Sequence, residues 1–340
     1  MVTLTVVLDK PDKRYQAGET IEAKIYISVF EPFNARSLSV RFLGVAFTEW
    51  TVSKTISQSG TTRHVQQKFV GYEEYFKDDH YFFGGDEAPI KEILPGSYDY
   101  EATFTLPKTL PTSFDHTLGH IRYEVQVTYD VPWEENYKCS EPFHVTSVLD
   151  LNMFPNLKEP IKAMEQKTFC CWCCTTDPLD IITILPKRGF VPGQNIPVTI
   201  EIDNNSNVRI DYVYLQLQER LTFQTNRPDN DVKVEQEMIK DHMFDTPVAP
   251  YQNKLFHVNL YVDPLYQWKI FPGCEIIKCD YVLKAVAGVS GCHMNPENQL
   301  SVTIGTVPFL GDERSPNDLP SYQEITAGDD PPKFEDLKNL

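Results

Sequence analysis

One pattern of residues occurs twice in this chain, and this repeat constrains the fold more than any other feature. A turn around Gly18 and the stretch after it reappear around Gly193, an offset of 175 residues. Alternating isoleucines follow each glycine at that same offset, Ile25 and Ile27 in the first copy and Ile200 and Ile202 in the second. The offset falls to 158 between Tyr123 and Tyr281. The pattern indicates two copies of one fold, with shorter loops in the second.

Each copy is built from residues that alternate between apolar and polar. In the first copy the apolar positions run from Tyr98 to Leu106 and again from Ile121 to Tyr129. A period of two is typical of a strand with one buried face and one face in water. The intervening loop, 107–119, contains prolines that cannot continue a strand ladder. Because neither copy shows a sustained amphipathic helix, the sequence predicts an all-β protein of two consecutive antiparallel immunoglobulin-like β-sandwiches.

The repeat also divides the chain. We expect a first sandwich over residues 1–148, a cysteine-containing linker over 149–176 and a second sandwich over 177–310. Residues 311–340 are rich in proline and carry eight acidic against three basic residues. A segment with so few apolar side chains cannot offset its ordering entropy, so we expect a disordered acidic tail.

A phase change in the first sandwich predicts an irregular strand. Apolar residues alternate first as Leu38, Val40 and Phe42 and then as Leu43, Val45 and Phe47. A shift of one residue beside Gly44 is typical of a β-bulge that turns the buried face over. Residues 51–70 are mostly polar and rich in Ser, Thr and Gln, which predicts a hairpin with an exposed connection.

Charge and composition exclude several classes of protein. The chain carries 31 basic and 48 acidic residues, a net charge of −17, which argues against a nucleic-acid partner. It contains no apolar run of about 18 residues, and its start lacks the basic region of a signal peptide. Its eight cysteines do not have the spacing of a secreted disulfide framework. We therefore expect a cytoplasmic protein.

No catalytic motif is apparent. The sequence contains no P-loop, no GxGxxG and no HExxH, and Gly288–Gly291 lacks the spacing of a nucleophile elbow. We therefore expect a non-enzymatic protein without a cofactor.

Four cysteines lie within five positions, and three interpretations of them are open. They are Cys170, Cys171, Cys173 and Cys174. Their C-x-x-C spacing would suit half of a zinc site, although four thiols so close together can hardly surround one tetrahedral ion. Acylation is a second interpretation, because lysines precede the cluster. We favour the third, reduced thiols that pack near the junction of the domains as small hydrophobes.

Several motifs resemble those of the arrestin domain-containing proteins, the alpha-arrestins. One signature comprises Pro111 and Phe114, followed by Gly119-His120-Ile121-Arg122-Tyr123. The cysteine stretch, running into Asp177-Pro178-Leu179, is similar to the start of the second domain in that family. The resemblance covers about residues 1–310 in order. One departure is Val131-Pro132-Trp133, where the family often has Arg-Pro-Trp, which removes a cation beside that turn.

The resemblance implies an adaptor. Alpha-arrestins dock on membrane receptors or transporters, and a tail PPxY motif recruits WW domains of HECT-type ubiquitin ligases, which leads to ubiquitination, endocytosis and trafficking of the cargo. The matching residues here are Leu319, Pro320 and Tyr322, with Leu in place of the first proline. A weaker second motif is Pro331-Pro332-Lys333-Phe334. The resemblance thus implies peripheral association with the plasma membrane or endosomes through cargo.

An alternative function is also open. The same doubled sandwich also serves trafficking-coat subunits, which act without a ubiquitin ligase.

The role of Arg122 has two interpretations. Arg122 lies between two apolar residues, so its side chain points away from the core, where it would be a rim charge. The resemblance implies instead a buried ion pair across the sandwich.

Overall fold

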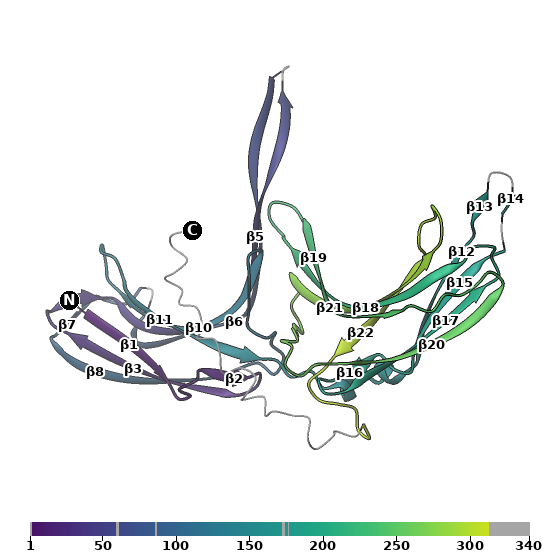
Figure 1. Ribbon diagram of the computed structural model, residues 1–340. Coiled ribbons are helices and arrows are strands. Elements are labelled where there is room, and N and C mark those ends of the chain that lie inside the picture. The colour runs from purple at the N-terminus through teal and green to yellow at the C-terminus, as the bar shows by residue number, and fades with distance from the viewer. Residues whose placement is uncertain (1, 59–60, 86, 172–173, 176, 313–340) are drawn as a thin grey trace.

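The computed structural model describes residues 2–58, 61–85, 87–171, 174–175 and 177–312. It shows two β-sandwiches that lie side by side as two lobes (Figure 1). Only two short 3-10 helices occur in the described residues, η1 (Leu151–Met153) and η2 (Pro155–Lys158). The expectation of an all-β protein with two consecutive sandwiches is confirmed.

The first sandwich packs a three-stranded sheet, in the order β1-β3-β8, against a larger sheet in the order β2-β11-β10-β5-β6. Its strands are β1 (Val2–Leu8), β2 (Arg14–Gln16), β3 (Thr20–Val29), β4 (Phe33–Ala35), β5 (Ser37–Gln58), β6 (Thr61–Gly84), β7 (Lys91–Ile93), β8 (Gly96–Thr105), β9 (Phe114–His116), β10 (Gly119–Asp130) and β11 (Tyr137–Thr146). β9 pairs with β10, and β4 pairs with β7 in a separate ribbon. The hairpin of β5 and β6 extends well beyond the other strands (Figure 1).

The second sandwich repeats this arrangement with sheets in the order β12-β15-β17-β20 and β16-β22-β21-β18-β19. Its strands are β12 (Ile161–Lys167), β15 (Leu179–Leu185), β16 (Gly189–Phe190), β17 (Asn195–Asn204), β18 (Ile210–Gln224), β19 (Val232–Phe244), β20 (Gln252–Tyr261), β21 (Ile277–Val289) and β22 (Glu297–Ile304), together with the short ribbon of β13 (Cys170–Cys171) and β14 (Cys174–Thr175). The larger sheets of the two sandwiches therefore have equivalent strands in the same order.

Strand registers confirm the repeat residue by residue. Ile25 pairs with Tyr100 across β3 and β8, and Ile200 pairs with Phe256 across β17 and β20. All four isoleucines of the repeat are buried, because they lie on the inner face of each sheet. Gly18 and Gly193 both have φ of +90°, a conformation that glycine adopts without strain, so both copies start with the same turn.

The β-bulge beside Gly44 is present, but it lies in the partner strand. Gly44 pairs with Phe76 and Val45 pairs with Glu74, which leaves Tyr75 of β6 as the extra residue. The expected phase change of β5 is wrong, because every even-numbered residue from Leu38 to Trp50 is buried. A Cβ on Gly44 would lie 2.6 Å from the Phe76 ring and 2.7 Å from that of Tyr123. The glycine therefore makes room for rings that fill the core.

The expectation of a linker over residues 149–176 is wrong for residues 149–169, because these pack on the second sandwich. The Leu149 N–H donates to Thr306 Oγ1 at 2.9 Å, and Leu151 is buried against Phe309. β12 pairs with β15 along its whole length. It was missed because only Ile161 and Ala163 of its residues pack on the core. The connection between the sandwiches is thus only Ser147 and Val148.

Candidate functional site between the two sandwiches

The signature loop that precedes β10 is fixed to the core by one tyrosine. The buried Tyr123 hydroxyl donates to the Pro111 carbonyl oxygen at 2.7 Å. Gly119 permits a close approach to β5, since a Cβ there would lie 2.5 Å from the Phe47 carbonyl oxygen. These contacts bring Pro111, Gly119 and Tyr123 of the sequence motif together. They place the loop at the side of the first sandwich that faces the second.

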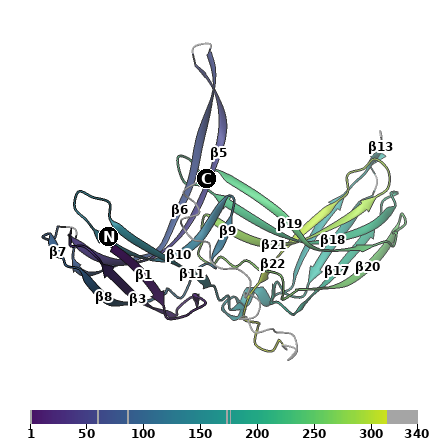
Figure 2. The ribbon, with the colours of Figure 1, turned by 60° about the vertical axis from the view of Figure 1, so that its left-hand side comes forward.

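Aromatic rings from this loop form the apolar part of the interface, which we call the seam. Phe114 in β9 packs on Phe271, with ring centroids 4.9 Å apart. His116 stacks on Phe223 at 4.8 Å, and its Nε2 lies 3.3 Å from the Glu235 carboxylate. Figure 2 shows β9 between the two lobes. Apolar side chains of the second sandwich complete the hydrophobic core of the first, namely Leu221, Phe223, Cys274, Ile276 and Ile277.

Arg122 forms a rim ion pair. Its Nη2 lies 2.6 Å from Asp115 Oδ1, and the two side chains are 18% and 41% exposed. Asp115 lies on β9, which neighbours β10, so this pair joins adjacent strands of one sheet. The pair with Asp115 therefore runs along one sheet, and the ion pair across the sandwich that the resemblance implies stays a prediction.

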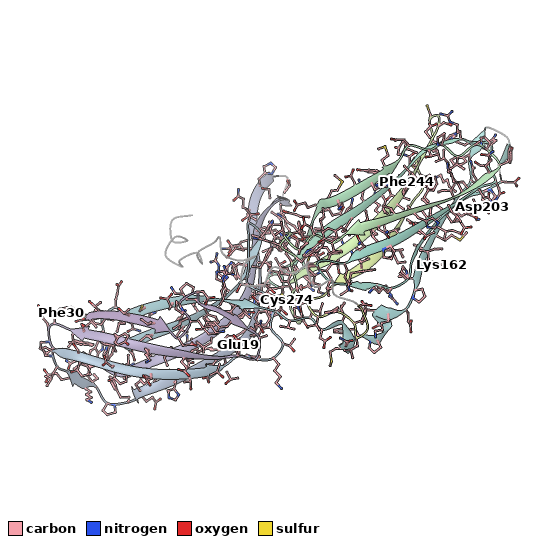
Figure 3. The ribbon with its side chains drawn as sticks, turned by 60° about the horizontal axis from the view of Figure 1, so that its bottom comes forward. Glu19, Phe30, Lys162, Asp203, Phe244 and Cys274 are labelled. Carbon is pink, nitrogen blue, oxygen red and sulfur yellow. The ribbon has the colours of Figure 1, made fainter. Side chains whose placement is uncertain are left out.

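Glu73 forms the polar centre of the seam, and sequence reasoning did not identify it. Its Oε2 accepts from the backbone N–H of Glu275 at 2.8 Å and of Ile276 at 3.3 Å, both in the second domain. The Cys274 Sγ lies 3.8 Å from the same oxygen. Burial raises the pKa of Cys274 to about 11, so the thiol stays protonated at neutral pH and donates to the carboxylate. Figure 3 shows Cys274 where the two domains meet.

A second polar contact holds the base of the β5–β6 hairpin. The Trp50 Nε1 donates to Asp231 Oδ2 at 2.8 Å, and Thr48 Oγ1 donates to the Gln224 carbonyl oxygen at 2.7 Å. The Val70 N–H donates to the carbonyl oxygen of Arg227 at 2.8 Å. The loop between β18 and β19 thus supports the hairpin and limits its movement relative to the second sandwich.

A buried ion pair fixes the loop of the second domain that reaches the seam. Glu219 is 1% exposed; its Oε1 lies 2.7 Å from Lys269 Nζ, and its Oε2 accepts from the Tyr266 hydroxyl at 3.0 Å. The next residue, Ile270, accepts a hydrogen bond at its carbonyl from Thr112 N–H of the signature loop, at 3.1 Å. The repeat places Glu219 where the first sandwich has Gly44, since both lie opposite the tyrosines at offset 158. An acidic residue at a position where the first copy has glycine was the signal in the sequence for this buried ion pair.

The tail motifs lie outside the described residues. These are Leu319, Pro320 and Tyr322, and Pro331, Pro332 and Phe334. Of the cysteine cluster, Cys171 pairs with Cys174 in a tight ribbon, and Cys173 is outside the described residues. None of its side chains is described, so zinc, acylation and free thiols remain predictions.

The described part of the chain lacks two other kinds of feature. It contains no group of three or more His, Cys, Asp or Glu side chains placed to hold a metal ion. None of its helices is long and apolar enough to cross a membrane. The seam itself is held by backbone hydrogen bonds, ring contacts and carboxylates from both sandwiches.

Comparison with known proteins gives two domain matches. The family model described as "Arrestin (or S-antigen), N-terminal domain" matches residues 4–152, and "Arrestin (or S-antigen), C-terminal domain" matches residues 175–309. The two matches follow the order of the two sandwiches. β12, at the start of the second sandwich, lies between the two matched ranges.

Several known proteins are similar to this chain. Arrestin domain-containing protein 17 of Caenorhabditis elegans is 31% identical over 210 residues, 59% of this chain and 48% of that protein. Arrestin domain-containing protein 1 of Mus musculus is 25% identical over 96% of this chain and 73% of its own length. Thioredoxin-interacting protein of Pongo abelii is 24% identical over 84% of this chain and 70% of its own length.

The chain covers only part of the length of some relatives. It spans about half of the worm protein and 57% of arrestin domain-containing protein 1 of Rattus norvegicus. Both arrestin domains are nevertheless matched in order, and the expected resemblance is confirmed. The chain therefore belongs to the arrestin family, among the arrestin domain-containing proteins known as alpha-arrestins.

Proposed function

We propose that this protein is a non-enzymatic adaptor that links membrane receptors or transporters to WW-domain HECT ubiquitin ligases and so promotes their ubiquitination and endocytosis. The observation that carries the proposal is the order of the chain, two arrestin domains followed by Leu319-Pro320-Ser321-Tyr322. The adaptor acts in the cytoplasm and is recruited to the plasma membrane or endosomes by its cargo.

The ligase contact lies in the tail. A WW domain binds a polyproline-II segment between aromatic side chains, and a separate pocket takes the tyrosine ring. Pro320 supplies the proline step and Tyr322 the ring, whereas Leu319 gives apolar contact without the fixed φ of proline. Affinity is therefore modest, on the order of tens of micromolar, and several WW domains or a cargo contact must act together. The weaker motif ends in Phe334, which lacks the hydroxyl.

The tail leaves the second sandwich from a fixed point. The Asp312 carboxylate pairs with Lys187 Nζ and accepts from Gln194 Nε2 at 3.3 Å. Leu319 is seven residues farther along the chain, a distance of at most about 25 Å even when fully extended. A WW domain bound to this motif is thus held near the second sandwich, which raises its effective concentration at any cargo bound there.

Calorimetric titration of a peptide spanning Asp318 to Thr326 against tandem WW domains tests the ligase contact. We expect binding in the micromolar range that Tyr322→Ala abolishes and that Gln323→Ala, a matched control outside the motif, leaves intact. Absence of binding at millimolar peptide, or binding that survives Tyr322→Ala, would overturn the assignment. Those results would favour a coat subunit that acts without a ligase.

A further inference from the structure

One tryptophan combines an unfavourable backbone conformation with a side chain that is exposed to solvent. Trp133, in the turn between β10 and β11, has φ of +63° and is 92% exposed. The left-handed region suits glycine and asparagine, and a bulky residue there is strained by on the order of 1–3 kcal/mol. Since the exposed ring adds almost nothing to the core, stability does not explain its presence. Strain combined with exposure points to a binding role.

The turn that carries this ring is firmly fixed. Val131 N–H donates to Asn136 Oδ1 at 3.0 Å, and the Glu134 N–H donates to the Val131 carbonyl oxygen at 3.4 Å. At the base of the turn, Arg36 Nη1 lies 3.1 Å from Asp130 Oδ2. The indole is therefore presented to solvent from a pre-organised turn, which lowers the entropy lost on binding.

Other apolar side chains lie at the same end of the first sandwich. Phe30, Ile90 and Leu94 are 62%, 44% and 59% exposed, and with Trp133 they form what we call the distal patch. The pairing of Val29 with Gly96 brings the residues after β3 opposite those before β8. Figure 3 shows Phe30 at the end of the lobe farthest from the seam.

A cluster of rings joins the Trp133 turn to the rest of the patch. Phe33, in β4, packs edge-on against Tyr129 at 5.2 Å and against Tyr137 at 5.3 Å, and these two tyrosines pair at the ends of β10 and β11. Phe33 also pairs with Ile93, next to Leu94. The segments that carry the apolar side chains are thus joined through one ring cluster at this end of the sandwich.

The segments that carry the distal patch are rich in acidic residues. The described segments that carry it, 30–36, 87–94 and 130–136, hold six carboxylates and two basic residues. The carboxylates are Glu31, Glu87, Glu92, Asp130, Glu134 and Glu135. One of the two cations, Arg36, is engaged with Asp130. The rim is therefore negative, which repels an anionic bilayer and attracts a basic ligand.

We propose that the distal patch is a docking surface for a basic linear segment of a partner protein, with an aromatic or aliphatic residue of that segment packed beside Trp133. The apolar centre supplies the binding energy, and the acidic rim selects lysine and arginine and raises the association rate. Cytoplasmic flanks of membrane-spanning helices carry an excess of Lys and Arg, so membrane cargo is a natural source of such a segment. That choice of source rests on the proposed function, whereas the surface itself does not.

Fluorescence anisotropy with labelled peptides and the full chain tests the proposal. The probes are a peptide of alternating lysine and leucine, one with glutamate in place of lysine, and one with serine in place of leucine. Trp133→Asn removes the ring and suits the left-handed turn, so the variant folds. Leu265→Asn is the matched control, because Leu265 is exposed in the second domain. Glu134→Lys with Glu135→Lys reverses the rim charge, and Glu237→Lys is its control on β19.

We expect the lysine–leucine peptide to bind at least tenfold more tightly than the other two. Trp133→Asn should weaken it about tenfold or more, the loss of one buried aromatic contact, and the rim reversal should weaken it as well. The two control variants should bind like the wild type. Equal binding of the glutamate peptide, or no effect of Trp133→Asn, would overturn the proposal. So would co-sedimentation with phosphatidylcholine vesicles that Trp133→Asn abolishes, because a bilayer would then be the occupant.

This test is independent of the ligase contact. Phe30 of the distal patch lies at the end of the first sandwich farthest from the seam (Figure 3), whereas the WW motif follows the second sandwich in the sequence. Binding of the basic peptide without binding of a WW domain would support the distal patch and overturn the proposed link to ubiquitin ligases. Binding of a WW domain without binding of the basic peptide would support that link and overturn the distal patch.

Discussion

Tyr123 shows how one polar atom ties a sequence motif to the fold. Its hydroxyl is buried and donates to the Pro111 carbonyl oxygen, so Tyr123→Phe leaves that acceptor without its partner. We expect a loss of about 1–3 kcal/mol in the free energy of unfolding. Urea denaturation measures this, with Tyr26→Phe as a control, because Tyr26 is 46% exposed. Equal losses in the two variants would contradict the assignment.

His120 of the same motif makes stability depend on pH. Burial, and then the charge of Arg122, lower the pKa of His120 from 6.5 to about 4. Between these values the unfolded chain binds a proton that the folded chain does not, so stability falls as pH drops from 6.5 to 4. His120→Gln should flatten this part of a melting-temperature profile, whereas His64→Gln, at an exposed position, should not. Identical slopes for His120→Gln and the wild type would show that another group controls this pH range.

At the scale of elements, the alternation of apolar and polar residues predicted most strands of the sheets but few contacts of the seam. The inner faces of β8, β10 and β17 follow from a period of two, because a pleated strand turns successive side chains to opposite sides. The repeat predicted the shared strand order. β12 was not predicted as a strand, because only two of its side chains pack on the core. Contacts such as that of Glu73 with Ile276 join residues 203 positions apart and leave no local period in the sequence.

The loop 262–276 depends on the buried pair of Glu219 and Lys269. Lys269→Met removes the cation and leaves a carboxylate that is 1% exposed, so we expect a loss of about 3–5 kcal/mol in unfolding free energy. Replacing Glu219 with Leu in the same chain should recover part of it, because an apolar pair carries no unpaired charge. Chemical denaturation measures both, with Lys278→Met as a control on an exposed lysine. A loss below about 1 kcal/mol would place the pair among weak surface ion pairs.

At the scale of the molecule, the seam makes the two sandwiches one unit. The connection is two residues long, but side chains of the second sandwich complete the core of the first. A protease site inserted after Val148 should therefore give two fragments that still co-elute in size-exclusion chromatography. Phe223→Asp places a charge in the seam and should separate the cleaved fragments. Separation of the wild-type fragments at once would show that the covalent link, not the seam, holds the domains together.

At the scale of the molecule, the proposed adaptor holds membrane cargo and a ubiquitin ligase on one chain at the same time. Affinity purification of the full chain from cells, followed by identification of bound proteins by mass spectrometry, measures this directly. We predict that membrane receptors or transporters and WW-domain HECT ligases co-purify with the wild type, and that Tyr322→Ala loses the ligases and keeps the membrane proteins. Recovery of coat proteins without any ligase, or ligases retained by Tyr322→Ala, would contradict the account.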